Sequence, residues 1–245
     1  MRMGFLMHTL RYGRSGGYDA AAFWEDQHRR FGSDFRAVAD RPEDETGRYP
    51  AQRQAFLDFI TTLGCDLDGA SCIELGCGNG FWAGVVRAAG AASYRGFDIS
   101  AAAVRHCQSG IPDGTFDCLD LSRGTMPEGL QADVVFSIDV LQHVVEPELV
   151  ERFLRNMAIA TKPGGMLILT SYLGYGDQFN TPEEDIGLLG LRIPKLRWVH
   201  AWDVPTLSRN LIPCELVGRA PFWDKSILAF HRPAEEEGDS PFLSN

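Results

Sequence analysis

The sequence lacks the paired cysteines that mark metal-binding and redox domains. Its six cysteines are scattered, no Cys-x-x-Cys occurs, and no cysteine is paired with a histidine at the spacing of metal ligands. Several of them lie inside apolar runs, where a buried free thiol is the common state. We therefore expect no bound metal, and a reducing, cytoplasmic setting in which the thiols stay reduced.

Long apolar runs and an excess of positive charge are also missing. No apolar stretch approaches the roughly 18 residues that a membrane-spanning helix needs, and the first ten residues show no signal-peptide cleavage site. The formal net charge is −10, which disfavours a partner with a phosphate backbone. We expect neither a membrane nor a nucleic acid partner, and either a monomer or a homodimer.

Glycines, by contrast, are concentrated in one stretch, residues 71–82. An apolar run ends at Leu75, three glycines follow at alternate positions (Gly76, Gly78 and Gly80), and apolar residues then recur at helical spacing from Trp82. This pattern predicts a strand, a glycine loop and a helix. Glycines in such a loop let the backbone turn sharply and let a ligand approach closely, although a plain glycine-rich turn has the same appearance.

Two acids favour a nucleoside ligand for this loop. Glu74 lies at the end of the first strand, and Asp98 ends a second apolar run 18 residues beyond Gly80. An acid at about this distance is placed to bind ribose hydroxyls. A dinucleotide fingerprint needs a small residue three positions after its second glycine, where this chain has Phe81. The bulky ring therefore argues against NAD or FAD.

The pattern Glu-x-Gly-x-Gly-x-Gly resembles motif I of the class I S-adenosylmethionine (SAM)-dependent methyltransferases, of the small-molecule type. Three further segments resemble that family in the expected order: residues 116–120, residues 132–144, which resemble its motif IV, and residues 161–165, which resemble its Leu-Lys-Pro-Gly-Gly turn with Thr161 in place of leucine. The resemblance covers about residues 71–172. It implies an enzyme with SAM as cofactor and S-adenosyl-L-homocysteine (SAH) as product.

Alternating strand and helix patterns predict the fold class. We expect an α/β, doubly wound, mostly parallel sheet with helices on both faces, and the resemblance implies seven strands with an antiparallel last strand. Residues 1–65 are expected to form an N-terminal helical lid, residues 66–232 the methyltransferase core with an acceptor flap at 173–203, and residues 233–245 an acidic tail. The expected strands are 72–75, 93–97, 115–118, 132–138, 166–172, 214–218 and 226–231, and the expected helices are 19–30, 50–63, 81–89, 101–107, one from 147 that stops at 163–165, and 204–211.

The resemblance also implies a set of cofactor-binding residues. Asp98 is expected to hold both ribose hydroxyls, and Glu74 to orient the loop or to reach the cofactor ammonium through water. Asp120 is favoured over Asp117 as the acid that contacts adenine. Aromatic residues of the N-terminal lid, among them Tyr18, are candidates to cover the ligand. The full cofactor-binding set is Glu74, Gly76, Cys77, Gly78, Gly80, Asp98, Ile99, Asp120, Leu121, Ile138, Trp24 and Tyr49.

Three residues are candidates for the chemistry of transfer. His143 follows Asp139 by four residues, which places both on one face of a short helix, and a histidine there can accept the proton of the acceptor. It can equally serve only to close the pocket. His200, on the flap, is the rival base. We expect methyl transfer to an oxygen or nitrogen of a natural product, sugar or metabolite; the alternatives are a protein or peptide N-methyltransferase and a non-catalytic SAM-binding module.

Overall fold

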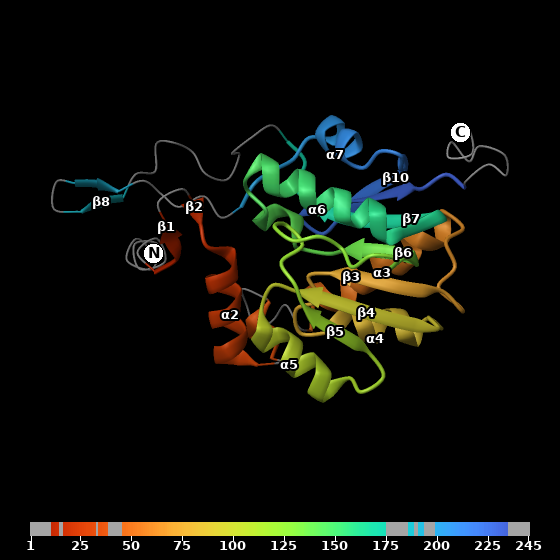
Figure 1. The fold of residues 1–245 in the computed structure, drawn as a ribbon, viewed down its shortest axis with the longest axis horizontal. Helices are drawn as coiled ribbons and strands as arrows, with labels where there is room; N and C mark the ends of the chain where they lie inside the picture. The colour runs from red at the N-terminus through yellow and green to blue at the C-terminus, as the bar shows by residue number, and fades with distance from the viewer. Residues whose placement is uncertain are drawn as a thin grey trace, which may run out of the picture.

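The computed structural model describes residues 11–14, 17–32, 34–38, 46–174, 186–188, 191–193 and 199–234. For residues 13–14, 17–18, 35, 186–188 and 191–193 it describes the backbone alone. Figure 1 shows that a twisted sheet forms the centre of the molecule. The strands of this sheet are β3 (Ser71–Leu75), β4 (Ser93–Asp98), β5 (Thr115–Cys118), β6 (Ala132–Ser137), β7 (Thr161–Ser171), β10 (Glu215–Phe222) and β11 (Lys225–His231).

The order of strands in this sheet is β10-β11-β7-β6-β3-β4-β5. Strands β3 to β7 are parallel to one another, whereas β11 is antiparallel to both β7 and β10. The chain runs from β3 to β4 and β5 on one side, then crosses to β6 and β7 on the other. The order therefore reverses between β3 and β6, the point at which ligands bind in open α/β sheets. The predicted seven-stranded, mostly parallel fold is confirmed.

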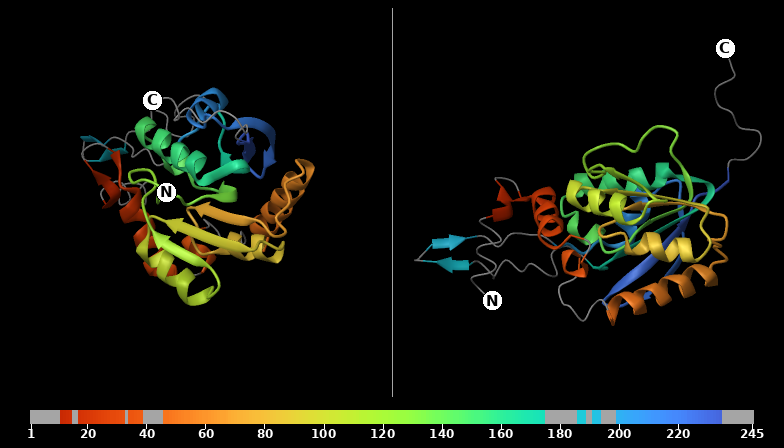
Figure 2. Two further views of the ribbon diagram at one scale, coloured as in Figure 1. Left: turned by 45° about the vertical axis from the view of Figure 1, so that its right-hand side comes forward. Right: turned by 90° about the horizontal axis from the view of Figure 1, so that it is seen from below.

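Helices cover both faces of the sheet. They are α2 (Ala20–Phe31), α3 (Arg48–Thr62), α4 (Phe81–Ala88), α5 (Ala101–Gly110), α6 (Pro147–Ala160) and α7 (Val204–Asn210). Figure 2 shows α6 and α7 on one side of the sheet and α4 and α5 on the other. Because side chains alternate along a strand, each face has its own core. Ile73 and Leu75 pack in the core under α6 and α7, whereas Cys72 packs in the core under α3, α4 and α5.

The end of α6 differs from the prediction. Residues 163–165 were expected to stop the helix and to precede the next strand. The helix instead ends at Ala160, and β7 begins immediately with Thr161, so that Pro163 lies inside the strand. The structure also adds two short hairpins that the pattern did not predict, β1 (Gly13–Arg14) with β2 (Gly17–Tyr18), and β8 (Ile186–Leu188) with β9 (Leu191–Ile193). Hairpins of two or three residues per strand carry too little periodicity to be detected.

The N-terminal elements lie where they can affect the site. Helix α3 packs on the sheet through Phe56, Phe59 and Ile60, while α2 stands beyond the ends of the parallel strands (Figure 1). The domain division at residue 65 and the acidic tail stay predictions, and residues 235–245 lie outside the described part of the chain. Across the described residues, no helix is both long and apolar enough to traverse a bilayer.

Candidate functional site

A cavity opens at the carboxyl ends of the parallel strands, between the sheet and α2. All the predicted cofactor-binding residues except Gly80 line its wall. Of the predicted catalytic residues, His143 and Asp139 line it and His200 does not. In the described part of the chain, no group of three or more histidines, cysteines or acids is arranged to hold a metal ion.

The glycine loop follows β3 and forms one wall of this cavity. The three glycines of the loop have positive φ angles, a backbone conformation that residues other than glycine rarely adopt. The angles are 83° at Gly76, 52° at Gly78 and 81° at Gly80. A Cβ atom on Gly76 would lie 2.3 Å from Cγ2 of Val140, so this position also lacks space. Gly80 precedes α4 and packs instead against Ile111, where a Cβ would meet the side chain at 2.5 Å. Its role in the structure is therefore to join the loop to the helix.

Asp98 lies at the end of β4 and is only 7% exposed. Its carboxylate accepts hydrogen bonds from the backbone N–H groups of Gly78 and Ser100, both at 2.8 Å. Burial raises the pKa of Asp98, while the nearby His28 and the two backbone bonds oppose that rise. Each carboxylate oxygen keeps a further lone pair, so the group can still accept hydrogen bonds from a ligand.

Glu74 is fully buried at the end of β3. Tyr94 donates a hydrogen bond to its Oε2, while Oε1 has no partner among the described residues. Burial raises the pKa of Glu74 well above its ordinary range. A buried polar atom that lines a cavity without a partner is a place where a ligand or water binds.

The far wall of the cavity comes from the segments after β4 and β5. Ile99, Leu121 and Asp120 line it. The Oδ1 atom of Asp120 accepts hydrogen bonds from the N–H and the hydroxyl of Ser122, at 3.0 Å and 2.6 Å. These local bonds fix the orientation of the carboxylate. The predicted role of Asp120 at adenine stays a prediction.

Helix α2 covers the cavity and is anchored to the core by one acid. The Glu25 carboxylate accepts from the Ser100 hydroxyl at 2.8 Å and from the Ala102 N–H at 2.9 Å, at the start of α5. The ring of Trp24, the residue before Glu25, packs edge-to-face with that of His143, with 5.1 Å between the ring centroids. Tyr49, from α3, is buried, and its ring centroid lies 4.9 Å from that of Phe81. The side chain of Tyr18 lies outside the described residues.

The two candidate bases occupy different environments. His143 ends the short 3-10 helix η3 (Leu141–His143) and lines the cavity beneath Trp24. His200 is buried behind the same segment, where its backbone N–H donates to the carbonyl of Gln142 at 2.8 Å and its ring lies 4.1 Å from that of Trp202. The geometry therefore favours His143 over His200 as a group that faces a ligand.

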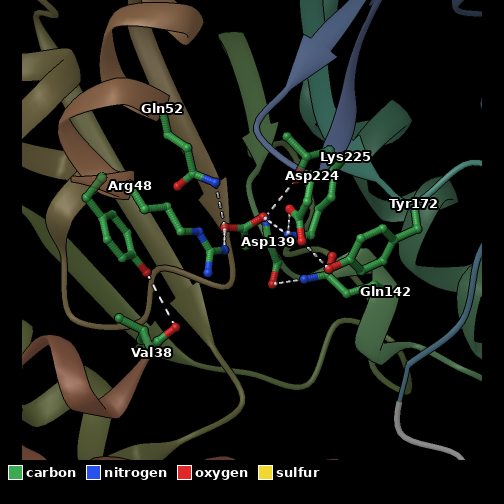
Figure 3. Close-up of polar contacts among 10 residues, drawn as sticks. Val38, Arg48, Gln52, Asp139, Gln142, Tyr172, Asp224 and Lys225 are labelled. Atoms are coloured by element: carbon green, nitrogen blue, oxygen red, sulfur yellow. Dashed lines mark hydrogen bonds and ion pairs between the residues drawn. The ribbon is translucent and has the colours of Figure 1, made fainter. Parts of the chain in front are cut away.

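Asp139 is held by charges that come from distant parts of the chain (Figure 3). Arg48 of α3 donates a hydrogen bond to its Oδ2, Gln52 donates to the same atom at 3.1 Å, and Nζ of Lys225 lies 3.1 Å from Oδ1. Burial alone would raise the pKa of Asp139, but Lys225 and Arg48 outweigh it and lower the pKa. A carboxylate stabilised in this way is a poor proton acceptor, which argues against Asp139 as the base.

With this geometry established, the chain can be compared with known proteins. Residues 46–211 match the family model described as a methyltransferase domain. The chain belongs to this methyltransferase-domain family. The matched residues include the glycine loop, Asp98 and His143, so most of the cavity wall lies within the matched domain, while the part from α2 lies outside it. The predicted class I methyltransferase and its enzymatic nature are thereby confirmed.

The curated relatives that the chain matches have names that refer to different acceptors. The chain is 26% identical over 145 residues to a ubiquinone biosynthesis O-methyltransferase of Neisseria meningitidis serogroup C (strain 053442), covering 56% of this chain and 59% of the relative. It is 29% identical over 158 residues to a tRNA U34 carboxymethyltransferase of Pseudoalteromonas translucida (strain TAC 125), covering 62% and 45%. The chain thus spans about half the length of the curated relatives it matches.

A solved structure of the magnesium protoporphyrin IX methyltransferase from Synechocystis PCC 6803 with bound SAM has a similar fold. The TM-score is 0.62, with 18% sequence identity over 89% of this chain and 100% of the other. At this identity the likeness concerns the fold alone.

Several residues in and around the cavity were not predicted. Glu25, His28, Arg48 and Lys225 come from the N-terminal extension and from the last hairpin, outside the segments that carry recognisable motifs. Arg48 and Lys225 had no local signal, because their partner Asp139 is remote in sequence. Glu25 and His28 follow Trp24 on one helix, and their proximity to a proposed lid residue was the only available hint.

Proposed function

We propose that this protein transfers a methyl group from SAM to an oxygen, or alternatively a nitrogen, of a small-molecule acceptor such as a natural product, sugar or metabolite. The observation that carries the proposal is the set of acidic side chains that line the cavity. Acids contribute six of its lining residues, and Arg123 is the sole lysine or arginine among those described. The six acids are Asp19, Glu74, Asp98, Asp120, Asp139 and Glu146.

The cavity suits the chemistry of this cofactor. When bound, SAM supplies a methyl group on a positively charged sulfur, and it also carries an ammonium group. Both charges favour a site lined by carboxyl groups over one lined by bases. The unpartnered Oε1 of Glu74 and the close backbone of Gly76 and Gly78 are consistent with a ligand that lies against the loop. The bulky Phe81 disfavours a dinucleotide.

We assign His143 the role of accepting the proton that the acceptor loses. His143 follows β6 and lines the cavity. Its ring packs edge-to-face with that of Trp24, which limits the rotation of the imidazole. A positioned histidine is the commonest general base in enzymes and contributes about 10²- to 10⁴-fold to a rate. Trp24 and the apolar residues Val144, Leu149 and Phe153 line the same cavity, and they would exclude water from the acceptor.

A small acceptor fits this cavity better than tRNA does, although one relative is named as a tRNA enzyme. Nucleic acid binding requires lysines and arginines that neutralise phosphates. The chain has a net charge of −10, and the cavity wall is acidic. This excess of acidic over basic side chains is why we propose a small-molecule acceptor.

The test is a screen of small-molecule pools for transfer of a labelled methyl group, first with the unaltered protein and then with His143→Gln. For an acceptor found in this way, the variant should lose at least about 100-fold in rate while its affinity for SAH, measured by calorimetry, stays unchanged. His231→Gln, at the end of β11, is the matched control and should keep full activity. Transfer to tRNA but to no small molecule would refute the proposed acceptor class.

A further inference from the structure

His28 is a buried histidine of α2 that the chemistry above does not use. Its side chain is 2% exposed and it lines the cavity. Its Nδ1 atom has no hydrogen-bond partner among the described residues. Leaving a buried polar nitrogen unpaired is unfavourable, so such an atom in a cavity wall indicates a group that binds there.

The position of His28 shows which part of a ligand it would meet. Trp24 and His28 are four residues apart and therefore lie on one face of α2. Trp24 contacts His143, at the end of the cavity where we place the transfer. His28, in contrast, lies close enough to Asp98 for each charge to influence the pKa of the other. Helix α2 thus extends along the cavity from the transfer site to the expected ribose site.

The protonation state of His28 suits a hydroxyl partner. Burial lowers its pKa, as does His106, while Asp98, the Gly32 backbone and Glu25 act in the opposite direction, and the net shift is downward. The ring is therefore neutral at pH 7, with one N–H and one lone-pair nitrogen. A sugar hydroxyl both donates and accepts, so it can pair with Nδ1 in either tautomer of the ring.

We propose that His28 binds one of the two ribose hydroxyls of the cofactor, opposite Asp98. The proposal rests on SAM as the ligand of the cavity. It makes helix α2 a part of the cofactor site rather than only its cover. Since Glu25 docks the same helix on Ser100, whose N–H in turn binds Asp98, both sides of the sugar would be held by one connected set of groups.

The experiment compares the loss of a ligand hydroxyl with the loss of the imidazole. Binding of SAH, 2′-deoxy-SAH and 3′-deoxy-SAH is measured by calorimetry for the unaltered protein, for His28→Phe, which keeps a ring without nitrogen, and for His28→Asn, which keeps a polar group near Nδ1. His28→Phe should weaken SAH binding about 3- to 10-fold, the usual contribution of one hydrogen bond. The deoxy ligand that lacks the hydroxyl bound by His28 should bind equally well to His28→Phe and to the unaltered protein. His28→Asn should recover part of the SAH affinity that His28→Phe loses.

Two controls separate hydrogen bonding from packing. His106→Phe changes a histidine of α5 whose ring lies 3.4 Å from the place that a Cβ atom on Gly32, at the end of α2, would take. His106 does not line the cavity, so this variant should leave SAH affinity unchanged. Thermal unfolding without ligand shows whether each variant folds. The proposal is overturned if removing either hydroxyl from SAH weakens binding to His28→Phe by the same factor as it weakens binding to the unaltered protein. It is also overturned if His106→Phe weakens SAH binding as much as His28→Phe does. Absence of SAH binding to the unaltered protein would instead overturn the cofactor assignment, and this proposal with it.

Discussion

Asp139 illustrates how one residue can be constrained from several directions at once. Its φ angle is +60°, a left-handed conformation that aspartate tolerates but seldom adopts. Its backbone N–H donates to the hydroxyl of Thr170 at 2.8 Å, while Arg48 and Lys225 hold the side chain. Because the residue lies directly after β6, these contacts set the direction in which the chain continues toward His143.

Replacing Asp139 with asparagine should lower stability strongly. The change keeps the shape but leaves Arg48 and Lys225, whose side chains are 14% and 3% exposed, without the charge between them. Breaking a buried ion pair costs about 3–5 kcal/mol, which urea unfolding would measure. Asp224→Asn is the matched control, because it pairs with the same lysine but is 50% exposed, and it should cost about 1 kcal/mol or less. Equal losses from both variants would contradict this account.

The same residue should influence stability at acid pH. Its pKa in the folded state lies below the ordinary value of 3.8, so the unfolded chain binds the proton more readily. The stability from Asp139 should be fully present above about pH 4 and lost as the pH falls through the folded-state pKa. Unfolding curves of Asp139→Asn should therefore lack this part of the acid-side decline. An identical acid-side decline in the variant would count against it.

At the scale of elements, an exposed clasp joins three strands at their amino ends. Asp133 of β6 accepts from the N–H and the hydroxyl of Ser71 in β3, at 2.8 Å and 2.5 Å, and from Nζ of Lys162 in β7 at 3.0 Å. Partial burial would raise the pKa of Asp133, but the bonds to Ser71 and Lys162 lower it to about 2. The clasp thus aligns β3, β6 and β7 at the edge opposite the cavity.

Asp133→Asn should reduce stability modestly, with the full effect only above about pH 4. The Asp133 side chain is 46% exposed, so solvent screening limits the effect at neutral pH to about 1 kcal/mol or less. Because the folded-state pKa is depressed, this contribution should disappear between about pH 4 and pH 2. Asp113→Asn, a 73% exposed partner of Arg87, should show no change in equilibrium unfolding across this range. A difference between Asp133→Asn and the unaltered protein that persisted at pH 2 would rule out the clasp as its cause.

Helix α2 docks on the start of α5 through one of its own carboxylates, that of Glu25. Glu25→Ala would remove the acceptor for the Ala102 N–H and the Ser100 hydroxyl, a loss of about 0.5–2 kcal/mol for a helix cap. We expect faster hydrogen exchange in residues 20–31 with unchanged exchange in β3 and β6. Glu25→Gln, which keeps an acceptor oxygen, should show a smaller effect. Faster exchange throughout the sheet would mean that α2 is not a separate unit.

At the scale of the whole molecule, the cavity joins parts of the chain that are far apart in sequence. Its wall combines the glycine loop, the ends of β4, β5 and β6, and the N-terminal helix α2. A ligand that fills the cavity would contact all of them, so binding should stabilise the protein as a unit. Such stabilisation follows the ligand concentration relative to its dissociation constant.

SAH at about 100 times its dissociation constant should stabilise the folded state by about 2.7 kcal/mol. For a chain of 245 residues this corresponds to a rise in Tm of about 5–10 °C, which differential scanning fluorimetry would detect. Asp98→Ala should reduce the rise, because it removes the expected ribose contact. NADH at the same concentration should give no rise, and a comparable rise with NADH would contradict the argument from Phe81.

The sequence by itself determined the seven-stranded fold, the glycine loop and the position of Asp98. These features depend on short-range patterns: the short apolar runs of the buried parallel strands, the glycines after β3, and an acid at the end of the next strand. Patterns of this kind are complete within a few residues, so they can be interpreted without knowing what packs against them.

Only the tertiary structure decided which groups surround the site. Asp139 was predicted as a candidate catalytic residue, yet Lys225 and Arg48, which together lower its pKa, are remote from it in sequence, Arg48 by 91 residues. The placement of Glu25 and His28 likewise depends on how α2 packs against α5, which helical periodicity does not reveal. Ion pairs and lid contacts join residues through space, and their energies depend on burial and distance rather than on the order of residues along the chain.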